Sequence, residues 1–289
     1  MKQEPASAFG EKVRIERRQA QDIVERMRAA AGVSIGPEKL AFIELRLGRR
    51  LREIGCPDFN TYLAILGGAG GREELANLVD CLTTNTTSFF RETAHYDWLA
   101  TTGAPDLVRS GAGRERDFVV WSAACSLGSE LWSAGMLLDE LGDGPLGRLR
   151  FALHGTDISR RILERAALAT FIDDELTGLD ETRRRRHLLK SRGPVGGRML
   201  YRISPELRRR ARFSYANLMQ LEGAPGVEVD VAFLRNVLIY FEPDQQTRAI
   251  SGVAQRLRRG GYLLIGHSES LPAPIPGLRQ VAPAVFLKE

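Results

Sequence analysis

The stretch Asp117-Phe-Val-Val-Trp-Ser-Ala-Ala-Cys-Ser-Leu-Gly-Ser-Glu130 decides the fold class of this chain. It contains a short apolar run and then a turn with Gly128, and helical spacing follows from Leu131 to Glu140. The order of strand, glycine-containing turn and helix is typical of α/β proteins, in which helices connect parallel strands. The stretch therefore predicts an α/β domain built on a parallel sheet with helices on both faces.

The order of strand, turn and helix recurs towards the C-terminus. Pro243 suits the first turn of a helix, and the pair Gly260-Gly261 is interpreted as the end of that helix. Strands are predicted over residues 149–155, 229–234 and 262–266, helices over residues 159–169 and 243–258, and an edge strand over residues 281–287.

The first 82 residues have a different pattern. Apolar side chains recur at helical spacing among charged ones, and no alternating strand pattern appears before about residue 115. We therefore expect an all-helical N-terminal domain over residues 1–82, a linker over residues 83–115 and the α/β domain over residues 116–289.

Composition narrows the class of protein. The chain has 289 residues, enough for about two domains, and 43% of them are hydrophobic. Its three cysteines lie far apart, which excludes a disulfide scaffold and fits a reducing compartment. No apolar run approaches the roughly 20 residues of a membrane span, and the N-terminus lacks the apolar core of a signal peptide. We expect a cytoplasmic protein.

The net charge of +5 comes from one segment. Residues 181–215 carry 12 Lys and Arg against 2 Asp and Glu. Such a segment could meet nucleic acid, a membrane surface or an acidic protein, or it could be a solvated helix face. The sequence leaves these alternatives open.

Polar side chains follow the predicted strands at their carboxyl ends, where open α/β sheets bind ligands. They are Glu130, Asp157, Arg235, Asn236 and Tyr240. A carboxylate after the second strand suits ribose hydroxyls. Neither a dinucleotide-binding G-x-G-x-x-G nor a P-loop is present. A nucleoside ligand without phosphate fits better, and S-adenosylmethionine (SAM) is the leading candidate.

Five segments resemble the chemotaxis receptor methyltransferases, the CheR family, in that family's order and spacing. The resemblance implies a Rossmann-like class I SAM-dependent methyltransferase domain, with a small β-subdomain inserted at about residues 170–215. It also implies that the linker packs over the cofactor. The segments are Thr83-Thr-Asn-Thr-Thr-Ser-Phe-Phe-Arg-Glu92, Trp121-Ser-Ala-Ala-Cys-Ser-Leu-Gly-Ser-Glu130, Gly155-Thr-Asp-Ile158, Arg235-Asn-Val-Leu-Ile-Tyr-Phe241 and Gly261-Tyr-Leu-Leu-Ile-Gly-His-Ser-Glu-Ser-Leu271.

The resemblance also implies an activity and a site. The implied enzyme transfers methyl groups from SAM to glutamate side chains of chemoreceptors, giving methyl esters and S-adenosylhomocysteine for chemotaxis adaptation, without a metal. Arg91 and Tyr240 would lie near the transferred methyl group. The implied cofactor-binding residues are Asn85, Thr87, Arg91, Glu130, Asp157, Asn217, Leu218, Arg235 and Asn236.

Partners follow from the same resemblance. They are the cytoplasmic domains of bacterial chemoreceptors, and in some family members a receptor C-terminal peptide tether binds the β-subdomain by adding a strand. We expect recruitment to receptor arrays, no nucleic acid, no membrane insertion and a monomer. His267 is expected to make structural hydrogen bonds rather than to bind a metal, because the sequence shows no partner ligands.

One segment departs from the family pattern. The family usually has Gly-Glu-Glu-Pro-Tyr-Ser where this chain has Gly128-Ser-Glu-Leu-Trp-Ser133, so Ser129, Leu131 and Trp132 differ. This departure keeps open a SAM-binding sensor or scaffold with little catalysis. A nucleic-acid methyltransferase that uses the basic segment is a third reading, although no Asn-Pro-Pro-Tyr-like motif follows the third strand.

Overall fold

The computed structural model describes residues 13–36 and 39–289 of the chain, so the first 12 residues of the predicted N-terminal domain lie outside the described residues. The chain forms two compact units, which divide between Thr83 and Thr84. Each unit has its own core. None of the helices in the described ranges is long and apolar enough to cross a membrane.

The first unit is a bundle of α1 (Arg17–Ala31), α2 (Leu40–Glu53), α3 (Phe59–Gly67) and α4 (Gly71–Leu82). Ile23 and Met27 of α1, like Ile43 and Leu47 of α2, are four residues apart and fully buried. Side chains at this spacing lie on one face of a helix, so each helix presents an apolar stripe to the others.

A carboxylate lies inside this bundle. Glu74 is 6% exposed and accepts hydrogen bonds from Arg50 Nη2 at 2.5 Å and from the Tyr62 hydroxyl at 2.9 Å. Burial alone would raise the pKa of Glu74, but these hydrogen bonds outweigh it and hold the pKa below its usual value. The charge therefore stays paired, as a buried ion must.

The second unit is built on a seven-stranded sheet in the order β6-β2-β1-β7-β8-β10-β9. The pairs from β6 to β8 are parallel, whereas β10 pairs antiparallel with both β8 and β9. Every residue of β1 and β7 is buried, as expected for central strands of a parallel sheet. The bounds are β1 (Phe118–Ser122), β2 (Phe151–Asp157), β6 (Ala211–Tyr215), β7 (Val229–Leu234), β8 (Leu257–Ile265), β9 (Leu278–Ala282) and β10 (Val285–Lys288).

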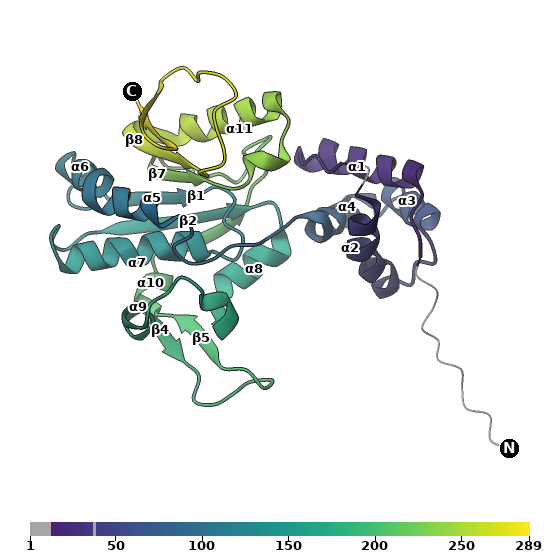
Figure 1. Cartoon of the computed structure of the whole chain (residues 1–289), viewed down its shortest axis with the longest axis horizontal. Helices are drawn as coiled ribbons and strands as arrows, with labels where there is room; N and C mark the ends of the chain where they lie inside the picture. Colours follow the sequence, from purple (N-terminus) through teal and green to yellow (C-terminus); the bar gives the residue numbers. More distant parts are fainter. Residues whose placement is uncertain (1–12, 37–38) are drawn as a thin grey trace. The chain divides into compact units, whose positions relative to one another are not determined.

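Helices cover the sheet (Figure 1). Buried residues of α5, α6 and α7 share one core with Val120, Phe233 and Leu264 of the central strands. Helix α8 contacts β2 and β6, and α11 contacts β7 and β8. The bounds are α5 (Thr93–Trp98), a π-helical turn η1 (Leu99–Gly103), α6 (Ala104–Arg109), α7 (Ser129–Asp143), α8 (Arg160–Leu168) and α11 (Pro243–Arg256).

A small antiparallel sheet in the order β3-β5-β4 lies between α8 and β6 in the chain. It occupies part of the range expected for the inserted subdomain, while β6 from the end of that range joins the large sheet. The bounds are β3 (Thr170–Ile172), η2 (Asp173–Leu176), α9 (Glu181–His187), β4 (Leu188–Lys190), β5 (Leu200–Ile203) and α10 (Pro205–Arg208).

The sequence interpretation was wrong about the end of α11. The helix ends at Arg256, and Gly260 and Gly261 lie inside β8 rather than after the helix. Gly260 has φ 81°, and a Cβ at Gly261 would lie 2.9 Å from the Asp230 carbonyl oxygen. Both glycines are therefore needed where β8 bends against β7 and the pairing register shifts. At the sheet edge, a hairpin of two strands replaces the single strand expected over residues 281–287.

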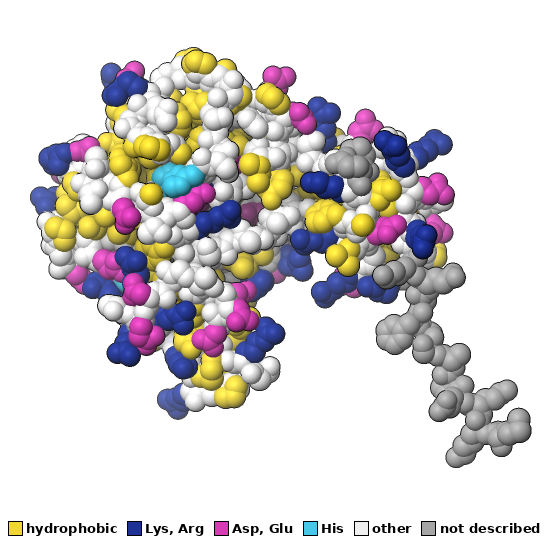
Figure 2. Space-filling model, viewed as in Figure 1, with side chains coloured by type: hydrophobic (Ala, Val, Ile, Leu, Met, Phe, Trp, Pro, Cys, Tyr) yellow, Lys and Arg dark blue, Asp and Glu magenta, His cyan; other side chains and the backbone are white. Residues whose placement is uncertain are grey.

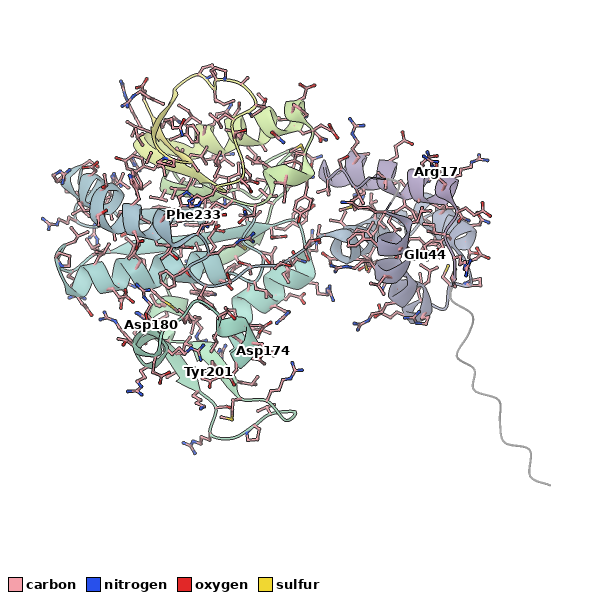
Figure 3. All side chains as sticks on the ribbon, in the orientation of Figure 1. Arg17, Glu44, Asp174, Asp180, Tyr201 and Phe233 are labelled. Atoms are coloured by element: carbon pink, nitrogen blue, oxygen red, sulfur yellow. The ribbon has the colours of Figure 1, made fainter. Side chains whose placement is uncertain are left out.

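Two arginines of the basic segment are paired with helix α7 inside the second unit. Arg183 binds both carboxylate oxygens of Glu140 on α7, and Arg186 binds Asp139 and Asp143 of the same helix. The backbone N–H of Arg183 donates to Asp180, which caps α9 and is labelled in Figure 3. In Figure 2, basic and acidic side chains are interspersed over the lower part of the view. Ion pairs therefore engage four of the segment's twelve basic side chains, namely Arg183, Arg185, Arg186 and Arg209.

Candidate functional site

The candidate site lies at the carboxyl ends of β1, β2 and β7. After β1 the chain turns at Gly128, whose φ is 83° and which caps the N-terminus of α7. A Cβ there would lie 3.0 Å from Trp132 Nε1 and 3.3 Å from the Phe213 ring. A Cβ at Gly155 of β2 would lie 2.6 Å from Phe213. Both positions therefore need glycine, because the Trp132 and Phe213 side chains occupy the space that a Cβ would take.

Asp157 ends β2 and is 7% exposed. One carboxylate oxygen accepts from the backbone N–H of Ser159 at 3.0 Å, and the other accepts from that of Ser126 at 2.9 Å. Ser126 has φ 50°, an unusual conformation that brings its N–H to the carboxylate. The carboxylate is thus held in one orientation beside the turn after β1. This is where a ribose binds in nucleotide-binding folds.

Arg235 lies between two carboxylates. Its side chain is 1% exposed and bridges Glu130 Oε2 at 3.2 Å and Glu92 Oε2 at 3.0 Å. It also donates to the carbonyl oxygen of Arg91. Glu130 accepts in addition from the Ser122 hydroxyl at 2.7 Å. Burial raises the pKa of Glu130, and Arg235 offsets that effect only in part. Burial alone would also raise the pKa of Glu92, but Arg235 and Asn236 hold it below its usual value.

The segment before α5 is fixed to the rest of the second unit. The Ser126 hydroxyl donates to the carbonyl oxygen of Asn85 at 2.9 Å, and the Ser133 hydroxyl accepts from the backbone N–H of Phe90 at 2.9 Å. Phe90 and Glu92 have φ values of 49° and 57°, so left-handed residues flank Arg91 on both sides. Such strain persists only where the surroundings impose it. The exposed Arg91 side chain is presented from this fixed segment.

The remaining predicted residues lie at neighbouring strand ends. Asn236 has φ 56° and donates from Nδ2 to Glu92 at 3.2 Å. Tyr240 ends the short helix η3 (Leu238–Tyr240) and is half-buried. Asn217 and Leu218 are buried just after β6, where the backbone N–H of Ala216 donates to the carbonyl oxygen of Asp157 at 3.0 Å. Arg235 therefore contacts Glu130 directly, and Glu92 links Arg235 to Asn236. Thr87 is half-buried on the segment before α5.

Sequence reasoning missed Glu92 and Glu269. Glu92 accepts from Arg235, from Asn236 and from the backbone N–H of His267. Glu269 accepts from the backbone N–H groups of Asn236 and Leu238. Both glutamates lie inside segments that carry the family resemblance. That resemblance was the signal that could have marked them as site residues. These five partners are 31 to 175 residues away along the chain, while Gly266, which also donates to Glu269, is three residues away.

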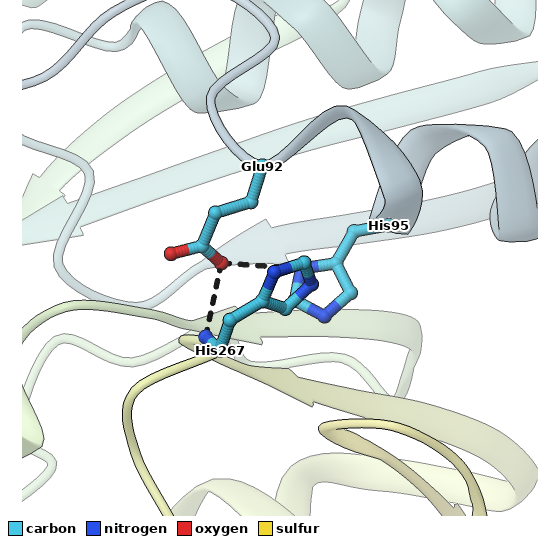
Figure 4. A group of neighbouring side chains, drawn as sticks. All are labelled: Glu92, His95 and His267. Carbon is cyan, nitrogen blue, oxygen red and sulfur yellow. Dashed lines mark hydrogen bonds and ion pairs between the residues drawn. The ribbon is translucent and has the colours of Figure 1, made fainter.

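Glu92, His95 and His267 form a cluster of potential metal ligands (Figure 4), whose ligand atoms all lie within 4.8 Å of one another. The two imidazole rings are 4.3 Å apart between centroids, and His95 Nδ1 lies 3.6 Å from Glu92 Oε2. However, the same Glu92 oxygen already accepts from Arg235 and from His267 N–H. A guanidinium beside the donor set opposes a second cation. The structure thus brings two potential ligands beside His267 that the sequence did not show, and the charge of Arg235 disfavours a metal ion there.

The buried His95 makes stability depend on pH. Burial, followed by the charge of Arg235, lowers the pKa of His95 to about 4. Because the unfolded chain binds this proton near pH 6.5, folding loses free energy as the pH falls through the window between these values. We expect a loss of about 2 kcal/mol between pH 7 and pH 5 from this residue, and His95→Gln should remove that part of the slope. Urea unfolding followed by tryptophan fluorescence measures it, since Trp98, Trp121 and Trp132 all lie in the second unit. Equal pH slopes in the variant and the unmodified chain would contradict the assignment.

Comparison with known proteins adds independent information. The family model described as "CheR methyltransferase, SAM binding domain" matches residues 85–283, and the one described as "CheR methyltransferase, all-alpha domain" matches residues 18–83. The chain is 32% identical over 286 residues to chemotaxis protein methyltransferase 2 of Pseudomonas aeruginosa, covering 98% of this chain and 97% of that protein. It is 34% identical over 241 residues to the chemotaxis protein methyltransferase of Escherichia coli, covering 83% of this chain and 80% of that one.

Proposed function

Since the chain belongs to the CheR methyltransferase family, we propose that it transfers methyl groups from SAM to glutamate side chains of chemoreceptors. The products would be glutamate methyl esters and S-adenosylhomocysteine. The observation that carries this proposal is the buried Asp157 carboxylate, held by two backbone N–H groups beside a glycine turn at the end of β2. The family and this geometry agree on a SAM-dependent methyltransferase.

The residues fit the cofactor. Asp157 would hold the ribose hydroxyls, and Asn217 with Leu218 would flank the adenine. Glu130 and Arg235 offer opposite charges for the amino and carboxylate groups of the methionine part. Asn85, Thr87, Arg91 and Asn236 would complete the pocket from the segment before α5 and from the loop after β7. We propose that residues 83–115 pack over the bound cofactor, which the link between Ser126 and Asn85 supports.

The reaction needs little from the protein beyond geometry. A glutamate side chain has a pKa near 4.3 in water and is already ionised at neutral pH, so it needs no general base. When bound, SAM supplies a methyl group activated by its sulfonium charge and leaves as S-adenosylhomocysteine. The chain has to align the substrate carboxylate and exclude water. Such alignment contributes on the order of 7–11 kcal/mol to a barrier.

We assign the alignment to Arg91 and Tyr240. Arg91 would hold the substrate carboxylate through paired hydrogen bonds from its guanidinium, and its fixed backbone supports that role. Tyr240 would direct its hydroxyl at the reacting groups.

Turnover is expected to fall when either side chain is removed. Tyr240→Phe should lower turnover about 100-fold, in the range found when one transition-state donor is lost, with little change in SAM affinity. Arg91→Ala should lower both turnover and affinity. Tyr215→Phe is the matched control, because that exposed tyrosine packs against Arg160 instead. If both variants keep full turnover and unchanged SAM affinity, both assignments fail.

Partner contacts are part of the proposal. The edge strand β4 of the small sheet, with Leu189 53% exposed, supports binding of a receptor peptide tether by strand addition. We further propose a cytoplasmic monomer that is recruited to receptor arrays. The nucleic-acid alternative loses part of its support because Arg183 and Arg186 are paired with α7. The family matches favour the enzyme over the sensor alternative, and a turnover measurement separates the two because both would bind SAM.

The proposal is tested by labelled methyl transfer from SAM to receptor-containing membranes, scored as methanol released by base. Base-labile label on receptors is the expected result. SAM binding without label would instead support the sensor alternative, and absence of SAM binding would overturn both.

A further inference from the structure

Glu269 has no assigned role, yet its carboxylate accepts three backbone hydrogen bonds. It lies in the segment after β8 and is half-buried. Oε2 accepts from Asn236 N–H at 2.9 Å and from Gly266 N–H at 2.7 Å, and Oε1 accepts from Leu238 N–H at 2.8 Å. One side chain therefore ties the segment after β8 to the loop after β7. Hydrogen bonds to an ionised acceptor are stronger than those to a neutral one.

The backbone around this carboxylate is strained and closely packed. Asn236 has φ 56°, a left-handed conformation that is uncommon outside glycine, although asparagine adopts it more readily than most residues. A Cβ at Gly266 would lie 2.7 Å from Glu269 Oε2 and 2.9 Å from Asn236 Nδ2. The two loops therefore pack closely at Gly266, which faces both the Glu269 carboxylate and Asn236. Glu269 supplies the acceptor that makes the strained conformation of Asn236 stable.

Gln246 holds the same loop from the other side. Its Nε2 donates from α11 to the carbonyl oxygens of Leu238 at 3.1 Å and Phe241 at 3.0 Å. Glu269 thus holds N–H groups and Gln246 holds carbonyl groups of residues 236–241. Tyr240 lies between these anchor points, and its own N–H donates to Val237 at 3.1 Å.

We propose that Glu269 is a positioning residue for methyl transfer, which fixes the loop that presents Tyr240 and the backbone of Asn236. The inference rests on the proposed function, because Tyr240 matters only if it acts in the reaction. Glu269 acts through the loop and not on the substrate. Gln246 is its counterpart on the carbonyl side.

Glu269→Gln is the sharpest variant, because glutamine keeps the size but places an NH2 donor against backbone N–H donors. We expect faster hydrogen exchange in residues 236–241 and a fall in kcat of about 10-fold to 100-fold, as for small misplacements of reacting groups. The KM for SAM should change less than kcat. Glu222→Gln, at an exposed glutamate, is the matched control and should change neither quantity. If Glu269→Gln does not fold, Gln246→Met tests the same loop from the carbonyl side.

The double variant with Tyr240→Phe separates positioning from general damage. If Glu269 acts through Tyr240, Glu269→Gln should lower kcat less than about threefold in the Tyr240→Phe background, because effects on one unit are not additive. A full further loss in that background, or unchanged exchange in residues 236–241, would overturn the role of Glu269. Full turnover by Tyr240→Phe alone would instead overturn the role proposed for Tyr240. A fall in kcat of Glu269→Gln could then not be explained by misplacement of the Tyr240 side chain.

Discussion

Asp157→Asn is expected to weaken SAM binding about 100-fold. The variant replaces one carboxylate oxygen with an NH2 group, and that group must then face the N–H of either Ser126 or Ser159. Hydrogen bonds to a charged group contribute about 1.5–3 kcal/mol each, and loss of about 2.7 kcal/mol is a 100-fold loss of affinity. Calorimetric titration with SAM measures the effect.

Titration with S-adenosylhomocysteine distinguishes two possible causes of weaker SAM binding: loss of a ribose contact and loss of charge attraction to the sulfonium. If the Asp157 carboxylate binds the ribose, Asp157→Asn should lower the affinity for both ligands by the same factor, because both contain the ribose. If the carboxylate only attracts the sulfonium charge, Asp157→Asn should lower the affinity for SAM alone. Asp173→Asn is the matched control, since Asp173 is exposed on the small subdomain. Unchanged affinity of Asp157→Asn for both ligands would remove Asp157 from the site.

The strand ends were predictable from the sequence because local pattern determines them. The apolar run before Gly128 forms β1, and the run from Val229 forms β7, whose core position Phe233 is labelled in Figure 3. Parallel strands place their carboxyl ends together, so Asp157 and Arg235 could be assigned to one edge before any coordinates. The family resemblance added residue roles that pattern alone could not supply.

The parts that could not be predicted depend on contacts between distant segments. Gly260 and Gly261 look like the end of a helix, and only the approach of the β7 backbone shows why β8 needs them. The arginines after Asp180 look like a free basic surface until α7 supplies Glu140. Most groups that Glu92 and Glu269 bind are 31 to 175 residues away, although Gly266 is only three residues from Glu269. No local pattern marks these two carboxylates as site residues.

The departure from the family pattern at Trp132 is absorbed by packing. Its indole is fully buried and lies 5.6 Å from Phe213 between ring centroids, beneath the turn at Gly128. Leu131 is also fully buried, while Glu130 on the same helix still reaches Arg235. The changes therefore lie on the core side of α7, and the polar side keeps its charged network. This arrangement favours retained cofactor binding, which the enzyme and the SAM-binding sensor both require.

Arg235→Met is expected to destabilise the second unit by about 3–5 kcal/mol, the usual cost of removing one partner from buried ion pairs. Methionine approximates the arginine stem, but Glu92 and Glu130 would then face one another without a cation. Their pKa values should rise above those of the unfolded chain. Groups whose pKa is raised on folding cost stability at high pH and regain it as the pH falls. The variant should therefore regain stability, relative to the unmodified chain, as the pH falls through the raised pKa values of these two glutamates.

Urea unfolding followed by tryptophan fluorescence measures both the cost and its pH slope. Adding Glu130→Gln to Arg235→Met should recover part of the lost free energy, because one of the two uncompensated charges is removed. Arg235→Lys should retain more stability than Arg235→Met but still lose binding, since a single ammonium cannot span Glu92, Glu130 and the Arg91 carbonyl at once. A cost below about 1 kcal/mol, with no pH slope and no recovery in the double variant, would mean that Arg235 is not the charge that holds this pocket together.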